Sequence, residues 1–193
     1  MLEQFLDHTG ITPPEAVAAT IGDNSADSCH VRWEYLWNQK REEWIRFMGW
    51  RWEQFYKKLC SAVHAVGKEV WALGMYCTDP FETRYVYGLE LQKAFEAGLD
   101  CVTANILPTG VAMTVKDSPY FFHRYHMIEP FLRAQIKDGR ILNMLGVQDA
   151  SEEWSVLEHQ PVKLERDIYT ITSYCYTDEK GCRSATDGMF ICL

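Results

Sequence analysis

The sequence predicts an α/β fold in which parallel β-strands alternate with α-helices. Three segments have the length and apolar composition of buried strands, and each leads to a carboxylate or an amide near its end: residues 69–77, 101–107 and 141–147. A strand in a parallel sheet is covered on both faces, so its side chains are nearly all apolar. Helical patterns separate the three segments, as the crossover connections of a parallel sheet require.

The strongest helical pattern lies between residues 33 and 66. Its apolar side chains recur at steps of three, four and seven residues and therefore share one helix face. Gly67 follows them, and a glycine is the usual residue just after the end of a helix. Gly49 marks a potential bend, so two consecutive helices are the alternative. The stripe consists of Trp33, Trp37, Trp44, Met48, Trp52, Phe55, Leu59, Val63 and Val66.

Further helices and strands follow in alternation. Gly98 and Gly139 mark the ends of two helices, and Ser118 followed by Pro119 marks the start of the second. The final residues, 188–193, are an apolar run that also resembles a strand. The remaining expected elements are helices at about 82–97, 118–138 and 151–158 and a strand at 167–177.

Residues 1–31 are predicted to be an irregular acidic loop region, and residues 32–193 an α/β domain. The first segment holds five acidic side chains, no Lys or Arg, and several Gly, Pro and Asn turn signals. The strands are about 30–40 residues apart, which suits a (β/α)-barrel. A complete barrel needs about 250 residues, so the 193 residues are expected to be a segment of a larger barrel. A doubly wound parallel sheet is the alternative.

Composition excludes several classes of function. The net charge is −8, without a basic stripe, which argues against nucleic acid as a partner. No apolar run reaches the roughly 18 residues of a membrane span, and no signal peptide is apparent. The seven cysteines are odd in number and form no CxxC pair, which predicts a cytoplasmic protein without a zinc site. Nucleotide-binding glycine motifs and the GxSxG elbow are absent, so no cofactor is expected.

The candidate site residues follow from the position of each strand. Asp79 is the second residue after the first strand and Asp149 the second residue after the third, where the chemistry of parallel sheets is usually found. Each is a candidate catalytic carboxylate, although helix capping explains either one as well. The expected substrate-binding residues are Asn105, Glu82 and the stacking candidates Tyr76 and Trp154. No metal site is expected, because the spacing of His123 and His126 alone is weak evidence.

Four short motifs resemble those of barrel-type glycoside hydrolases. They are Arg-Trp-Glu-Gln-Phe-Tyr at 51–56, Val-Gly-Lys at 66–68, Tyr-Val-Tyr-Gly at 85–88 and Ala-Gly-Leu-Asp at 97–100. In those proteins a helix ends in Gly-Lys before a strand, and Ala-Gly-x-Asp introduces the next one. The resemblance covers residues 44–107 and implies a TIM barrel that acts on carbohydrate. The Asn-Glu pair of many such enzymes is absent, so Asp79 and Asp149 are chosen on position alone.

The leading hypothesis is therefore a carbohydrate-active, glycoside hydrolase-like protein that uses carboxylates at the carboxyl ends of its strands. The second is a non-catalytic ligand-binding or assembly domain of the same architecture. A third is a different barrel enzyme that acts on a small polar metabolite. The expected partners are a carbohydrate or another small polar ligand, the missing part of a larger barrel, or a second copy of the chain.

Overall fold

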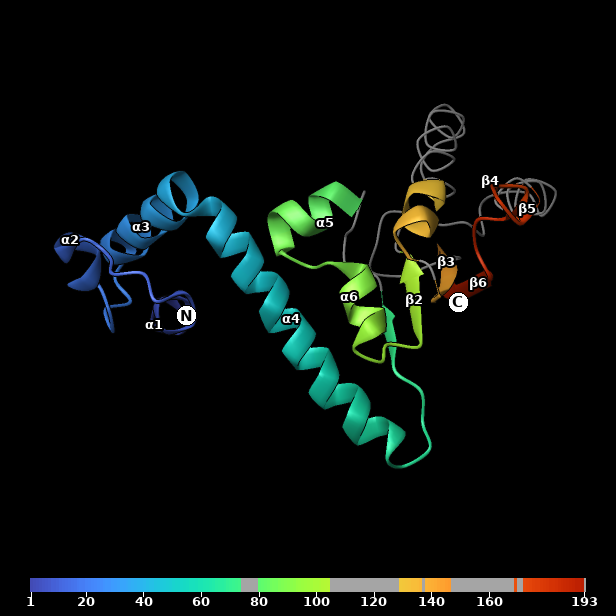
Figure 1. Ribbon diagram of the computed structural model, residues 1–193, viewed down its shortest axis with the longest axis horizontal. Helices are drawn as coiled ribbons and strands as arrows, with labels where there is room; N and C mark the ends of the chain where they lie inside the picture. The colour runs from blue at the N-terminus through green and yellow to red at the C-terminus, as the bar shows by residue number, and fades with distance from the viewer. Residues whose placement is uncertain (74–79, 105–128, 137, 147–168, 170–171, 193) are drawn as a thin grey trace.

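A computed structural model of the protein describes residues 1–73, 80–104, 129–136, 138–146, 169 and 172–192 (Figure 1). The first half is helical: α1 (Leu2–Thr9), α2 (Glu15–Ala18), α3 (Ala26–Glu34), the π-helical turn η1 (Tyr35–Gln39) and α4 (Arg41–His64). Residues 129–135 are helical as well. The other elements are β1 (Trp71–Leu73), α5 (Pro80–Tyr87), α6 (Leu91–Glu96), β2 (Cys101–Ala104), β3 (Arg140–Gly146), β4 (Cys175–Asp178), β5 (Gly181–Ser184) and β6 (Gly188–Cys192).

The expectation that residues 1–31 are irregular was wrong, because α1, α2 and most of α3 lie there. The turn signals mark the joints between these helices; Gly10, for example, ends α1 in the left-handed conformation. Phe5 and Val17 are buried together with Tyr35 of η1 and Phe47 of α4, in a first core. Such short helices gain most of their stability from this packing, which a local sequence pattern does not reveal.

The long helix predicted for 33–66 is broken at Lys40 and not at Gly49. Lys40 has a non-helical backbone (φ −130°, ψ 28°), and α4 then continues without interruption to His64. Its first half contributes Phe47 to the first core, and its second half contributes Tyr56 and Cys60 to a second core on the sheet. Figure 1 shows α4 running from the cluster of N-terminal helices to the sheet.

The sheet has four strands in the order β1-β2-β3-β6, and every neighbouring pair is parallel. An α/β fold with a parallel sheet is thus confirmed, and closure into a barrel is not seen among the described strands. The fourth strand is β6, from the apolar run at the end of the sequence. The strand predicted at 167–177 was placed wrongly, since its last residues form β4, which pairs antiparallel with β5 across a tight turn.

The second core lies on one face of the sheet. Ala72, Val102 and Ile141 are register partners on neighbouring strands and so point to the same side. Side chains from α4, α6 and residues 129–136 pack against that side, among them Cys60, Ala94 and Ile136. All the helices that contribute to this core therefore cover the same face of the sheet.

The helix predicted for 82–97 is divided into α5 and α6 at Gly88. Gly88 has φ +67°, and a Cβ there would lie 2.3 Å from the Cβ of Met48 in α4. A Cβ on Gly49 would in turn lie 3.3 Å from the Gly88 carbonyl oxygen. Gly49 therefore lies where α4 passes close to the end of α5 and little room remains for a side chain, which explains the glycine without a bend.

The resemblance motif at 97–100 has a structural role in this fold. The Asp100 carboxylate accepts a hydrogen bond from the Val70 amide at 2.7 Å and lies 2.8 Å from Nε2 of His64, in the last turn of α4. Burial opposes ionisation of Asp100, but the hydrogen bonds from His64 and Val70 outweigh it and lower the pKa of the carboxyl. Asp100 thus links the end of α4 to the starts of β1 and β2.

Candidate functional site

A groove of about 720 Å³ lies between α4, α5 and the helical residues 129–135. Helix α5 begins at residue 80, seven positions after β1 ends. The chain leaves the C-terminal end of α4 to enter β1, so the first turns of α4, which line the groove, are at the opposite end of the helix. Figure 1 shows β2 pointing toward the end of the molecule that carries α5. The groove therefore lies toward the carboxyl ends of the strands. It is lined by Glu42, Ile45, Arg46, Phe81, Glu82, Arg84, Tyr85, Val86, Phe131 and Gln135.

Aromatic side chains form much of the groove surface. Phe81 is 71% exposed and Phe131 is 47% exposed, and their ring centroids lie 6.1 Å apart in an edge-to-face arrangement. Tyr85 is held from the other side, because its ring contacts Trp37 of η1 and the Arg41 guanidinium lies 5.2 Å from its centroid. Exposed rings held in this way offer flat apolar surfaces to a ligand.

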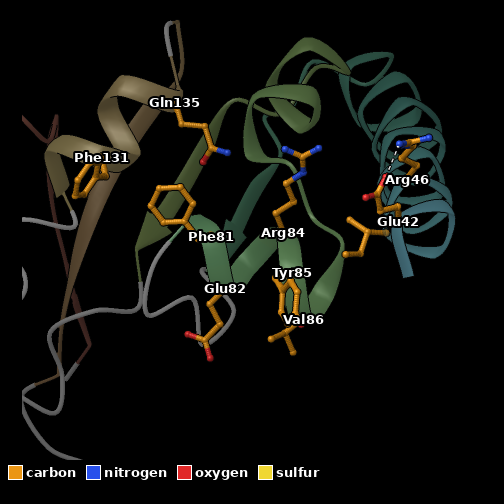
Figure 2. Close-up of a pocket in the computed structure, with 10 residues that line it drawn as sticks. Glu42, Arg46, Phe81, Glu82, Arg84, Tyr85, Val86, Phe131 and Gln135 are labelled. Carbon is orange, nitrogen blue, oxygen red and sulfur yellow. Dashed lines mark hydrogen bonds and ion pairs between the residues drawn. The ribbon is translucent and has the colours of Figure 1, made fainter. Parts of the chain in front are cut away.

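Polar side chains also line the groove (Figure 2). Glu82 is in the first turn of α5, and the Arg84 guanidinium lies 3.6 Å from the Glu90 carboxylate. On α4, Arg46 donates to Glu42 at 2.9 Å. The side-chain oxygen of Gln135 is buried and has no hydrogen-bond partner among the described residues. A buried acceptor without a donor is costly, and this oxygen is closed to solvent in the structure.

A buried acid lies next to the sheet, in the helical segment that carries Phe131. Glu129 is fully buried, and no well-formed hydrogen bond from a described residue reaches either carboxylate oxygen. Burial raises its pKa to about 8, and only the nearby amide of Asn143 in β3 opposes the rise. Arg133, one turn along the helix, pairs with Asp187 and donates to the carbonyl oxygens of Gly139 and Ala185. Glu129 is thus protonated at neutral pH, but it does not line the groove.

Glu82 is the one predicted site residue that falls within the described part of the chain, and it lines the groove. The others lie outside the described residues: Asp79, Asp149, Asn105, Trp154 and Tyr76. Sequence reasoning missed Phe81, Tyr85, Phe131 and Gln135 as lining residues. The only available signal was the position of Phe81 and Tyr85 beside Asp79 and Glu82, on the segment that follows β1.

In the described ranges, no group of three or more metal-ligating side chains is close enough to hold a metal ion. None of the helices within those ranges is long and apolar enough to cross a membrane. Comparison with known proteins found no matching family model, no similar curated protein and no similar solved structure.

Proposed function

We propose that the chain is a segment of a (β/α)-barrel protein that binds carbohydrate in the groove between α4, α5 and residues 129–135. The sheet supports the barrel part of this proposal. Its strands run in sequential order without a reversal, and the helices of the second core cover one face. A doubly wound sheet reverses its strand order and carries helices on both faces, whereas a barrel carries them on one.

The side chains that line the groove are the observation that supports a carbohydrate ligand. Exposed rings of Phe81, Tyr85 and Phe131 lie in the same groove as the polar side chains of Glu82 and Gln135. A sugar ring has apolar C–H faces that stack on aromatic side chains and hydroxyls that need donors and acceptors. A volume of about 720 Å³ lies within the range of small-molecule sites.

For the reaction, we propose glycoside hydrolysis with Asp79 and Asp149 as the two carboxylates. Such enzymes use one carboxylic acid to protonate the leaving oxygen and a second carboxylate as nucleophile or base. Asp79 immediately precedes α5 in sequence, and α5 supplies Phe81 and Glu82 to the groove. Tyr76, Asn105 and Trp154 are proposed to contact the substrate.

The alternative is a non-catalytic binding domain of the same architecture. One observation favours it: the Glu42 carboxylate in the groove is already engaged by Arg46. Without the proposed aspartates, the groove therefore lacks two acids poised for catalysis, although it keeps its binding surfaces.

Calorimetric titration with a panel of neutral oligosaccharides tests binding. Replacing exposed Phe81 with alanine should weaken binding about tenfold, as loss of a stacking contact does. Trp33, which is 53% exposed on α3 and is not among the residues that line the groove, provides the exposed aromatic control, Trp33→Ala. Failure of every oligosaccharide to bind, or an equal loss in both variants, would refute the carbohydrate site.

Hydrolysis is tested separately with chromogenic aryl glycosides. The Asp79→Asn and Asp149→Asn variants should lose turnover and keep oligosaccharide binding if the enzyme hypothesis is right. Turnover that persists in both variants would reject these residues as the catalytic pair. Binding without turnover in the unmodified protein would favour the non-catalytic alternative.

A further inference from the structure

We infer a second binding site, in a groove of about 600 Å³ between α1 and α4, that takes a carbohydrate carrying carboxylate groups. The groove is separate from the one described above and shares no lining residue with it. The inference therefore stands without the proposed function. The groove is lined by Gln4, Asp7 and His8 of α1 and by Trp50, Arg51, Gln54, Phe55 and Lys58 of α4.

The pairing of the basic side chains on α4 points to an anionic ligand. Arg46 pairs with Glu42 at 2.9 Å, and Lys57 pairs with Glu53 at 2.6 Å. Arg51 and Lys58 have no carboxylate within ion-pair distance among the residues whose positions are described. These two are also the α4 cations that line the groove. With two cations that have no ion-pair partner and one carboxylate, Asp7, this concave site is net positive in a chain of net charge −8, which favours a bound anion.

Aromatic side chains of the same groove favour a ligand with an apolar face. Trp50 is 40% exposed and stacks on His8, with ring centroids 4.1 Å apart. Phe47 lies beneath them, fully buried in the first core, so this aromatic stack is anchored. Phe55 is 51% exposed and adds a second apolar surface about one helical turn away.

The polar side chains distinguish an acidic sugar from a dense polyanion. The amides of Gln4 and Gln54 each offer donors and an acceptor, which suits the hydroxyls of a sugar. Asp7 also lines the groove, and its carboxylate disfavours closely spaced phosphates or sulfates while it can accept hydroxyl hydrogen bonds. An oligosaccharide with one carboxylate per ring satisfies both sets of groups.

Calorimetric titration of the full chain with trigalacturonate, and with its neutral counterpart galactotriose, tests this site. We expect trigalacturonate to bind more tightly and its affinity to fall as salt is added, because the contacts are ionic. The Arg51→Gln and Lys58→Gln variants should each weaken binding about fivefold, as loss of an exposed charge contact does. Lys57→Gln is the matched control, since Lys57 is adjacent in sequence and already paired.

Three results would overturn the inference: no binding of trigalacturonate, equal affinity for galactotriose, or an equal loss in the Lys57→Gln variant. The Phe81→Ala variant separates the two sites, because it should leave trigalacturonate binding at this groove unchanged. A loss of trigalacturonate binding in Phe81→Ala would place the acidic sugar in the first groove and reject the second site.

Discussion

Replacing Glu129 with glutamine should make the protein more stable at neutral pH. It should also remove the pH dependence that Glu129 gives to the free energy of unfolding. Glu129 is fully buried in the structure, and burial raises its pKa from an ordinary 4.5 to about 8. The unfolded chain releases this proton near pH 4.5, whereas the folded protein retains it up to about pH 8. Between these values the folded state binds more protons, so the free energy of unfolding falls as the pH rises.

The size of the effect follows from the width of this window. Each pH unit between 4.5 and 8 costs about 1.4 kcal/mol of stability. At pH 7 the penalty is on the order of 3 kcal/mol, and it is complete near pH 8. Glutamine has nearly the shape of the protonated acid and never ionises, so Glu129→Gln avoids the penalty.

Urea unfolding at pH 5, 6, 7 and 8 measures the difference directly. The stability of the variant relative to the original protein should rise with pH by about 1.4 kcal/mol per unit, and by less close to pH 5 and pH 8. Glu96→Gln changes an exposed carboxylate in α6 and serves as the control. Parallel stability curves for Glu129→Gln and the original protein would show that Glu129 is ionised in the folded state, and the reasoning from its burial would fail.

Three further outcomes are expected. Gly88→Ala should destabilise the fold by about 3 kcal/mol or more in urea unfolding, because φ is +67° and the new Cβ would overlap Met48. Gly10→Ala introduces the same backbone strain in open space and should cost about 1 kcal/mol. Equal costs for the two variants would contradict the close approach of Gly88 to Met48. Asp100→Asn should lower the free energy of unfolding by about 1–2 kcal/mol at pH 7. The pKa of Asp100 is lowered in the folded protein, so its contribution is present above the unfolded pKa and is lost on acidification; the difference between the two proteins should therefore shrink below about pH 4. A difference that does not depend on pH would exclude a role for the charge next to His64. Among the described residues, Cys29, Cys175 and Cys182 have exposed thiols, whereas the thiols of Cys60 and Cys101 are buried and their pKa is raised by burial. Native-state alkylation followed by mass spectrometry should modify the exposed thiols well before the buried ones, and equal rates would contradict the burial of Cys60 and Cys101.

Local signals in the sequence determined much of the helix and strand order. The apolar stripe of α4 and the continuous apolar segments at β1, β2 and β3 are properties of neighbouring residues, so periodicity alone predicted them. Gly67 and Gly98 lie in the positive-φ region just after helices, where their conformational freedom made the prediction reliable. A parallel sheet followed from the helices between the strands.

Tertiary contacts decided what the local pattern left open. The short helices of residues 1–31 depend on Phe47 of α4, which lies far away in sequence. Gly49 suggested a bend, but its neighbour in space is Gly88, and α4 continues through a position where a propensity argument would break it. The fourth parallel strand is β6, which pairs with β3 in a register that places Leu142 opposite Gly188. This pairing joins distant segments and is seen only in the sheet.

The two grooves were likewise decided by tertiary contacts. Phe81 and Phe131 are 50 positions apart, and Asp7 and Lys58 are 51 apart, yet each pair lines one cavity. The sequence by itself determined the alternation of helices with parallel strands and predicted Glu82 as a site residue. Only the tertiary structure decided which side chains meet and which acid is buried, because cavities and desolvation arise from packing between distant segments and not from local pattern.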